Sequence, residues 1–155
     1  MIRVGLGTDL HRLVEGRRLL LAGVEIPSGR GEDAHSDGDV LAHAVIDAVL
    51  GAAALGDIGE FFPDTEAAYK NADSMMLLSR CWKQVQKEGW HLGNLDCVIV
   101  LETPKVLPYR EKIRASLARA LDSEAVFVKA KTAEGIGPLG EGAAIGAEAV
   151  CLLEK

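Results

Sequence analysis

Two hydrophobic periods alternate along the chain, and each predicts a different kind of element. Several stretches carry apolar residues at every second position, or aliphatic and β-branched residues throughout, which is typical of strands. A turn at Glu15-Gly16 predicts that the first two of these strands pair as a hairpin. The predicted strands are residues 2–8, 18–26, 94–101, 125–131 and 143–153.

Helical spacing replaces this alternation in three other stretches. Leu41, Ala44 and Ala48 recur at intervals of three and four residues, which predicts a helix from about Asp39 to Leu55. Two further helices are predicted, one over residues 73–88 that is capped by Asp73 or Ser74, and one from the Pro104–Pro108 loop to about residue 121.

The connections concentrate the turn-forming residues. Ser36 followed by Asp39 resembles a capping box for the first helix. Residues 57–70 show no clear period and are expected to form a loop, whose length is typical of functional loops. The glycine-rich segment 134–142 is expected to bend around a ligand or an interface.

The order of the predicted elements indicates the fold class. The order β-β-α-α-β-α-β-β does not alternate strictly, so a doubly wound parallel sheet is not expected. A length of 155 residues is typical of one domain that can bury a core without disulfides. We therefore predict a single α+β domain over residues 1–155, with two layers in which a mixed β-sheet packs against helices.

Charge and composition narrow the function classes. The net charge of -6 argues against a nucleic-acid partner, and no apolar run is long enough for a bilayer, so no membrane association is expected. No targeting signature precedes the first strand, which predicts a cytoplasmic protein of a bacterium, or one of the plastid stroma if it is a processed plant protein. Cys81, Cys97 and Cys151 form no C-x-x-C pair and are expected to be buried free thiols in a reduced compartment.

An aspartate and two histidines fall where zinc ligands could converge. Asp9 and His11 are two residues apart and leave the same face of an extended strand. His43 lies in an apolar helix between Asp39 and Asp47, and burying three polar side chains costs several kcal/mol unless each has a partner. Three such ligands suit a catalytic zinc with an open fourth position. The spacing alone leaves open that His43 is a hydrogen-bonded core residue and that Asp39 caps its helix.

Several other polar residues are compatible, taken singly, with ordinary loop, surface or turn roles: Asp57, Asp64, Glu66, Lys105, Thr132 and Glu134. In order along essentially the whole chain, however, the segments resemble the family of 2-C-methyl-D-erythritol 2,4-cyclodiphosphate synthases. The matching segments are GTDLH (7–11), AHSDGDV (34–40), LGAAALGDIG (50–59), FPDT (62–65), PK (104–105) and KTAE (131–134).

The resemblance implies a phosphoryl transfer in non-mevalonate isoprenoid biosynthesis. The 2-phosphate of 4-diphosphocytidyl-2-C-methyl-D-erythritol 2-phosphate would attack the β-phosphorus of the same molecule. Cytidine monophosphate (CMP) would leave, and a cyclic diphosphate would remain. Because the nucleophile is already anionic, catalysis would rest on alignment and on charge neutralisation.

The same resemblance implies roles for the matching residues. Asp9, His11 and His43 would hold Zn²⁺. The remaining metal and catalytic roles would fall on Glu134, as a ligand of Mg²⁺ or Mn²⁺, and on the catalytic residues His35 and Thr132. The implied substrate contacts are Ser36, Asp57, Ile58, Gly59, Phe62, Pro63, Asp64, Thr65, Glu66, Leu101, Glu102, Thr103, Pro104, Lys105, Val106, Leu107, Ala130, Lys131 and Ala133.

The resemblance further implies a homotrimer with active sites between subunits and an apolar channel on the three-fold axis. Many relatives carry an aromatic residue and an arginine before the last strand, and residues 137–142 carry neither, which puts isoprenoid-diphosphate binding at the channel mouth in doubt. Two alternatives stay open: a zinc-dependent phosphohydrolase, and a non-catalytic trimer that binds an isoprenoid diphosphate. The identity of the product would separate them.

Overall fold

The computed structural model describes residues 1–155, which form strands, helices and two 3-10 turns. The strands are β1 (Ile2–Glu15), β2 (Leu19–Leu21), β3 (Val24–Ile26), β4 (Arg30–Asp33), β5 (His91–Val100), β6 (Val126–Lys131) and β7 (Ala144–Glu154). The helices are α1 (Val40–Ala53), α2 (Ile58–Phe61), α3 (Ser74–Lys87), α4 (Arg110–Ala120) and α5 (Gly137–Gly140), with the 3-10 turns η1 (Ala67–Tyr69) and η2 (Leu107–Tyr109).

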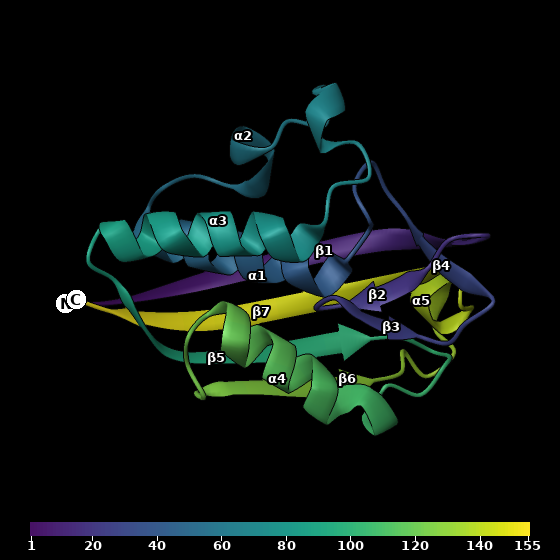
Figure 1. The fold of residues 1–155 in the computed structure, drawn as a ribbon. Helices are drawn as coiled ribbons and strands as arrows, with labels where there is room; N and C mark the ends of the chain where they lie inside the picture. The colour runs from purple at the N-terminus through teal and green to yellow at the C-terminus, as the bar shows by residue number, and fades with distance from the viewer.

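The molecule has the two layers that the sequence predicted. Five strands form one sheet in the order β4-β1-β7-β5-β6, and α1, α3 and α4 lie on one side of it (Figure 1). Strand β5 runs parallel to β6 but antiparallel to β7, so the sheet is mixed. The predicted α+β class, with a mixed sheet against helices, is confirmed.

The segment predicted as one strand over residues 18–26 is a separate two-stranded sheet. Ala22 and Gly23 have φ angles of 50° and 74°, and they reverse the chain between β2 and β3, which pair with each other. Strand β1 pairs instead with β4 and β7. The expected hairpin between residues 2–8 and 18–26 is therefore wrong, because the apolar run conceals a reversal in its middle.

The connections also differ from the sequence-based picture. The predicted loop over residues 57–70 contains α2 and η1, and the glycine-rich segment contains α5. The expected capping box is wrong: Asp39 caps α1 alone by accepting the Ala42 N–H, while Ser36 Oγ accepts the Gly38 N–H at 3.2 Å.

The core lies between the sheet and α1. Eleven of the fourteen residues of α1 are buried, since the helix is covered by the sheet below and by α3 above. The three cysteines are buried and free, as predicted, and burial raises the pKa of Cys97 to about 12. No helix combines the length and the apolar character that crossing a membrane requires.

Close contact between β1 and α1 depends on two glycines. A Cβ at Gly5 would lie 1.9 Å from the carbonyl oxygen of Ala48, and one at Gly7 would lie 1.8 Å from that of Ala44. Only glycine permits this approach of strand and helix. The alternation of glycine in β1 therefore seats α1 directly on the strand, with His43 beside Asp9.

A buried carboxyl group on β4 makes folding sensitive to pH. Glu32 is fully buried, its Oε2 accepts the Leu20 N–H at 3.0 Å, and its Oε1 has no partner. Burial, together with the nearby charge of Asp39, raises the pKa of Glu32 to about 8. Since the folded protein holds this proton above the pH at which an unfolded glutamate releases it, stability falls as the pH rises toward 8.

We expect Glu32→Gln to remove much of this pH dependence, because glutamine keeps an acceptor for Leu20 without a charge. Between pH 5 and pH 8 the wild type should lose about 3 kcal/mol more of its unfolding free energy than the variant. Urea unfolding at the two pH values measures the difference. Glu25→Gln is the control: Glu25 is exposed on strand β3, so this variant should follow the wild type. Equal pH slopes in the wild type and Glu32→Gln would contradict the prediction.

Candidate active site

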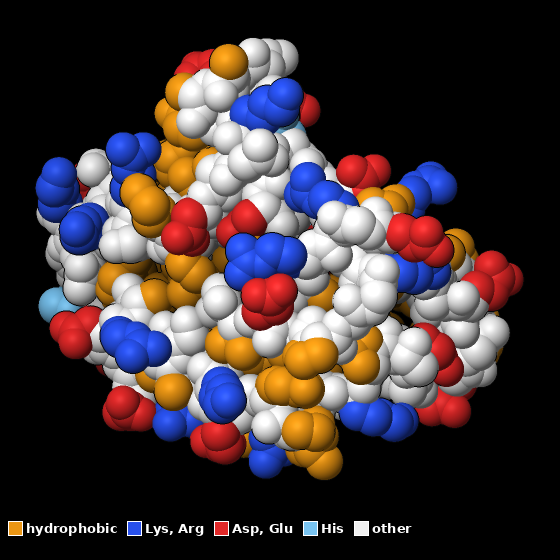
Figure 2. All heavy atoms as spheres, turned by 45° about the vertical axis from the view of Figure 1, so that its right-hand side comes forward, with side chains coloured by type: hydrophobic (Ala, Val, Ile, Leu, Met, Phe, Trp, Pro, Cys, Tyr) orange, Lys and Arg blue, Asp and Glu red, His pale blue; other side chains and the backbone are white.

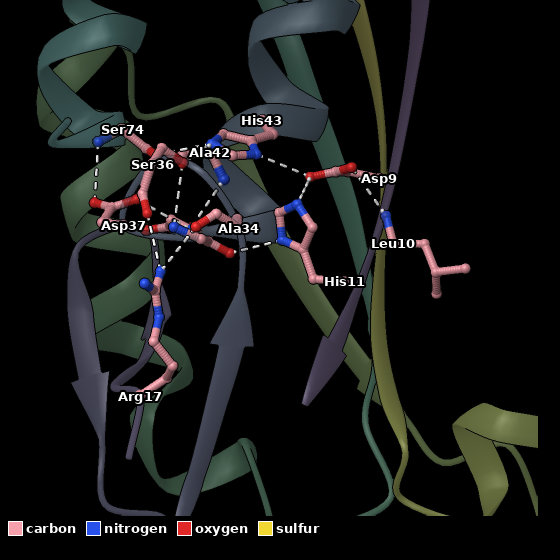
Figure 3. A network of polar contacts seen from close by, with 12 residues as sticks. Asp9, Leu10, His11, Arg17, Ala34, Ser36, Asp37, Ala42, His43 and Ser74 are labelled. Carbon is pink, nitrogen blue, oxygen red and sulfur yellow. Dashed lines mark hydrogen bonds and ion pairs between the residues drawn. The ribbon is translucent and has the colours of Figure 1, made fainter. Parts of the chain in front are cut away.

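Three side chains from two elements converge on one point beside the sheet. Asp9 and His11 leave the same face of β1, and His43 reaches them from α1 (Figure 3). Oδ2 of Asp9 lies 3.3 Å from Nε2 of His11 and 3.0 Å from Nδ1 of His43. One ligand atom from each residue lies within 4.8 Å of the others. The structure therefore assembles the three residues that the sequence predicted as metal ligands.

The ring of His11 is fixed by the backbone of the next segment. Its Nδ1 lies 2.8 Å from the carbonyl oxygen of Gly38. A carbonyl only accepts, so Nδ1 carries the proton and Nε2 presents its lone pair toward Asp9. Gly38 has a φ of +84°, and a Cβ there would lie 2.7 Å from the Glu32 side chain, so the loop that offers this carbonyl requires glycine.

The ring of His43 lies between Asp9 and two serines. Its Nδ1 faces the carboxylate, while its Nε2 lies 3.1 Å from Ser36 Oγ and 2.9 Å from Ser74 Oγ (Figure 3). The Ser74 hydroxyl donates in turn to the carboxylate of Asp37. Both nitrogens of the ring are thus engaged, and its orientation is determined by partners on β1, on the connection between β4 and α1, and at the start of α3.

The two histidines differ in their electrostatic surroundings. Burial lowers the pKa of His11, although the Asp9 carboxylate opposes this effect. Burial acts in the same direction on His43, but the hydrogen bond and charge of Asp9, with Asp39 and Asp37, raise its pKa above the ordinary value. A metal ligand must be deprotonated, so metal binding at this site should weaken in acid.

The donor set and its spacing fit a zinc ion. One carboxylate oxygen and two imidazole nitrogens are typical ligands of Zn²⁺. Adjacent ligand atoms of a tetrahedral zinc site lie roughly 3.4 Å apart. The separations of 3.0 and 3.3 Å at Asp9 are close to this value, so the three side chains could hold the ion with little rearrangement.

A cavity of about 530 Å³ opens beside the two histidine ligands. The segment 57–70 forms one wall, and it projects from the body of the molecule at the top of Figures 1 and 2. Tyr69 and Leu77 complete the apolar part of the lining. The sequence-predicted residues that line this cavity are His35, Ser36, Ile58, Gly59, Phe62, Pro63, Asp64 and Thr65.

Three acidic residues near this wall have structural contacts. Asp57 caps α2 by accepting the Glu60 N–H at 2.9 Å, and Asp47 accepts the Ile58 N–H at 2.8 Å. The carbonyl oxygen of Glu66 lies 3.3 Å from Nε2 of His35. The two polar residues in the predicted apolar helix therefore have different roles: His43 faces the metal site, while Asp47 positions the start of α2.

The remaining substrate contacts that the resemblance implies, in residues 101–107 and 130–133, lie together elsewhere. The Leu101 N–H donates to the carbonyl of Lys131 at 3.0 Å, and the Ala133 N–H donates to Oε2 of Glu102 at 3.1 Å. The Thr132 hydroxyl donates to Oε1 of the exposed Glu134 at 3.1 Å. These contacts join residues 101–107 and 130–134 where β5 and β6 end, at the lower right of Figure 1.

Neither of these segments lines the cavity beside the histidines. Leu101 and Val106 are core residues with 4% exposure each, so their side chains face the interior. Thr103, Lys105 and Leu107 are exposed on the same connection. Within one chain the candidate site consists of two separate halves.

Sequence reasoning missed three residues that position His43 or the backbone around His35. Arg17 donates to the backbone carbonyls of Glu32 and Ser36, at 3.0 and 2.9 Å, and so braces the segment that carries His35. Asp37 and Ser74 contact each other behind His43. Asp37 lies in the motif that was recognised, whereas no sequence signal links Ser74 or Arg17 to it.

Comparison with known sequences places these features in context. Residues 2–154 match the profile of the YgbB family. A protein of Treponema denticola named 2-C-methyl-D-erythritol 2,4-cyclodiphosphate synthase is 54% identical over 154 residues, which cover 98% of this chain and 96% of the relative. One of the same name from Chloroherpeton thalassium is 51% identical over 156 residues, 99% of each chain.

Solved structures give the same picture of the fold. The bifunctional IspDF from Campylobacter jejuni superposes with a TM-score of 0.95 at 42% identity, over 99% of this chain and 42% of the other. A 2C-methyl-D-erythritol-2,4-cyclodiphosphate synthase in a CDP-bound form gives a TM-score of 0.90 at 40% identity, over 98% of this chain and all of that one.

Proposed function

Because the chain belongs to the YgbB family, we propose that it is a 2-C-methyl-D-erythritol 2,4-cyclodiphosphate synthase of non-mevalonate isoprenoid biosynthesis. The observation that carries this proposal is the convergence of Asp9, His11 and His43 beside a cavity of substrate size. The substrate is 4-diphosphocytidyl-2-C-methyl-D-erythritol 2-phosphate. Its 2-phosphate oxygen forms a bond to the β-phosphorus, the bond from that phosphorus to the bridging oxygen breaks, and CMP leaves, so the reaction is that of a phosphorus–oxygen lyase.

We assign the metal sites by their donor atoms. Asp9, His11 and His43 hold Zn²⁺, which when bound supplies Lewis acidity toward a phosphate oxygen. Glu134 offers an exposed carboxylate, the type of ligand that Mg²⁺ or Mn²⁺ prefers. His35 and Ser36 contact the methylerythritol phosphate from the cavity rim, and the Thr132 hydroxyl donates to the diphosphate.

The two halves of the site would be joined in an oligomer. Residues 101–107 and 130–134 do not line the cavity of their own chain, so a neighbouring copy would supply them. A homotrimer with active sites between subunits satisfies this requirement. A separate observation supports assembly: Ile2, Val4 and Leu6 are each 65% exposed, on the face of β1 opposite to α1.

Phosphorus NMR of the protein with this substrate, with and without Zn²⁺ plus Mg²⁺, tests the activity. The proposal expects a metal-dependent cyclic diphosphate together with CMP. A linear phosphorylated product that contains solvent oxygen would identify a phosphohydrolase instead. Substrate that remains unchanged while zinc is bound would support the alternative of a non-catalytic binding protein.

The proposed trimer predicts the effect of a charge on the exposed sheet face. Leu6→Glu should convert the trimer to monomers at micromolar concentration and reduce activity together with assembly. The reason is that a trimer would bury three carboxylates in an apolar interface, and each desolvated charge costs several kcal/mol. Sedimentation velocity measures the change.

The matched control is Met76→Glu on α3. Met76 is 60% exposed but lies on the helical side of the molecule, so this substitution should leave the sedimentation coefficient unchanged. A monomeric wild type, or a trimeric Leu6→Glu variant, would refute the proposed arrangement.

A further inference from the structure

We infer that Ser74, oriented by Asp37, is a positioning residue that holds His43 in the Nε2–H form, so that Nδ1 is the atom presented to the metal. This inference rests on the zinc site of the proposed function and adds residues that the sequence motifs did not assign. The hydrogen bonds that carry it run from Asp37, in the connection between β4 and α1, to Ser74 at the start of α3, and from there to His43 in α1 (Figure 3).

The first step is that Asp37 accepts two hydrogen bonds from Ser74. The Ser74 backbone N–H donates to Oδ2 of Asp37 at 3.0 Å, and the Ser74 hydroxyl donates to Oδ1. Oδ1 also accepts the Asp39 N–H at 3.1 Å. A carboxylate surrounded by donors on both oxygens can only accept, so the hydroxyl proton of Ser74 points toward Asp37.

The second step follows from the position of that proton. With its hydrogen directed at Asp37, Ser74 Oγ presents lone pairs to Nε2 of His43, which lies 2.9 Å away. Nε2 must then carry a proton and donate it. Ser74 is fully buried at the first residue of α3, so no water competes for this contact.

The third step concerns the other nitrogen of the ring. Protonation of Nε2 in a neutral imidazole leaves a lone pair on Nδ1, which faces Oδ2 of Asp9 at 3.0 Å. In the metal-free protein Nδ1 can hold a proton and donate it to Asp9. A divalent cation bound at this position would displace that proton, while Nε2 keeps its contact with Ser74. The arrangement is therefore complementary to a metal ion bound by Nδ1, and partners of this kind typically change metal affinity about 10- to 100-fold.

The two histidines would consequently use different nitrogens. His11 donates from Nδ1 to Gly38 and binds through Nε2, whereas His43 donates from Nε2 to Ser74 and binds through Nδ1. Ser36 Oγ, at 3.1 Å from the same Nε2, also accepts the Gly38 N–H and lies on the cavity wall. Its position is less constrained than that of Ser74, which is held by both oxygens of Asp37.

Imidazole nitrogen NMR of the zinc-loaded protein labelled with ¹⁵N-histidine tests the assignment directly. We expect Nε2 of His43 to be protonated and Nδ1 to be metal-bound, with the reverse for His11. Zinc bound to His43 through Nε2 would overturn the inference.

Zinc affinity, measured by competition with a chromophoric chelator, provides the second test. Ser74→Ala should weaken zinc binding at least 10-fold, while Ser74→Thr, which keeps the hydroxyl, should restore most of the affinity. Ser116→Ala is the control, because that hydroxyl contacts only the Ala22 carbonyl, and it should bind zinc like the wild type. Affinity of Ser74→Ala within twofold of the wild type would overturn the inference. A loss of zinc affinity in Ser36→Ala without a loss in Ser74→Ala would also overturn it.

Asp37→Asn keeps the test decisive if Ser74→Ala does not fold. In this variant the amide NH₂ group must face one of the groups that donate to Asp37, which are the N–H groups of Asp39 and Ser74 and the Ser74 hydroxyl. Zinc affinity should therefore fall. Unchanged zinc affinity would overturn the inference. A wild type that binds no zinc would instead refute the zinc site of the proposed function, and the inference with it. The two failures are therefore distinguishable.

Discussion

Replacement of His43 by alanine is expected to lower kcat/KM for cyclisation by a factor of about 10³. The substitution removes one of three protein ligands from the candidate zinc site, and only Asp9 and His11 would remain. The interaction at stake is the charge stabilisation that a metal provides to a phosphate in the transition state, which is worth several kcal/mol. Initial rates by phosphorus NMR, together with the zinc content of the purified variant, measure the effect.

His91→Ala is the matched control for this experiment. His91 is exposed at the start of β5 and contributes to neither half of the candidate site. Its replacement should leave both the rate and the zinc content within twofold of the wild type. Activity of the His43→Ala variant near the wild-type level would remove the metal site from the proposed mechanism.

Replacement of Asp39 by alanine is expected to cause the largest loss of stability. Asp39 is fully buried, and its carboxylate accepts the N–H groups of Ala42, Ala22 and Gly23 at 3.0, 2.9 and 2.7 Å. It therefore caps α1 and at the same time ties the β2–β3 turn to the start of that helix. Alanine would leave the buried N–H groups of Ala42 and Ala22 and the exposed one of Gly23 without this acceptor, which should cost about 4 kcal/mol in unfolding free energy.

The corresponding fall in melting temperature is about 10 °C, measured at one fixed protein concentration because assembly would contribute to stability. Asp73→Ala is the control, since Asp73 caps α3 in an exposed position by accepting from Met75 and Met76. It should cost only about 1 kcal/mol. Equal losses in the two variants would show that the link to the β2–β3 turn adds nothing to the cap.

The comparison of these two caps illustrates what local sequence can predict. Both aspartates precede an apolar periodic stretch, and both cap a helix as such a pattern indicates. Nothing near Asp39 in the sequence shows that it also binds residues 16 and 17 positions earlier. That second role depends on how the β2–β3 turn packs, so its energetic weight became visible only in the structure.

Strand pairing shows the same division. The apolar run over residues 18–26 correctly indicated extended backbone, but it did not reveal the reversal at Ala22-Gly23 or the choice of β4 and β7 as neighbours of β1. Strand propensity is a local property, whereas pairing is decided by the core that all strands share. Likewise, the glycines at positions 5 and 7 could be read as small residues, but their contact with α1 could not.

For the site, the sequence by itself determined the ligand chemistry and the family resemblance, because Asp9, His11, His43 and the segments around them carry that information in their identity and spacing. Only the tertiary structure decided which partner each ring nitrogen contacts, since Gly38 and Ser74 lie 27 and 31 residues away from the rings they hold. It also decided that the cavity and the segments 101–107 and 130–134 are separate within one chain. The reason is physical: donor types belong to single residues, but hydrogen-bond direction and cavity walls arise from contacts between distant parts of the chain.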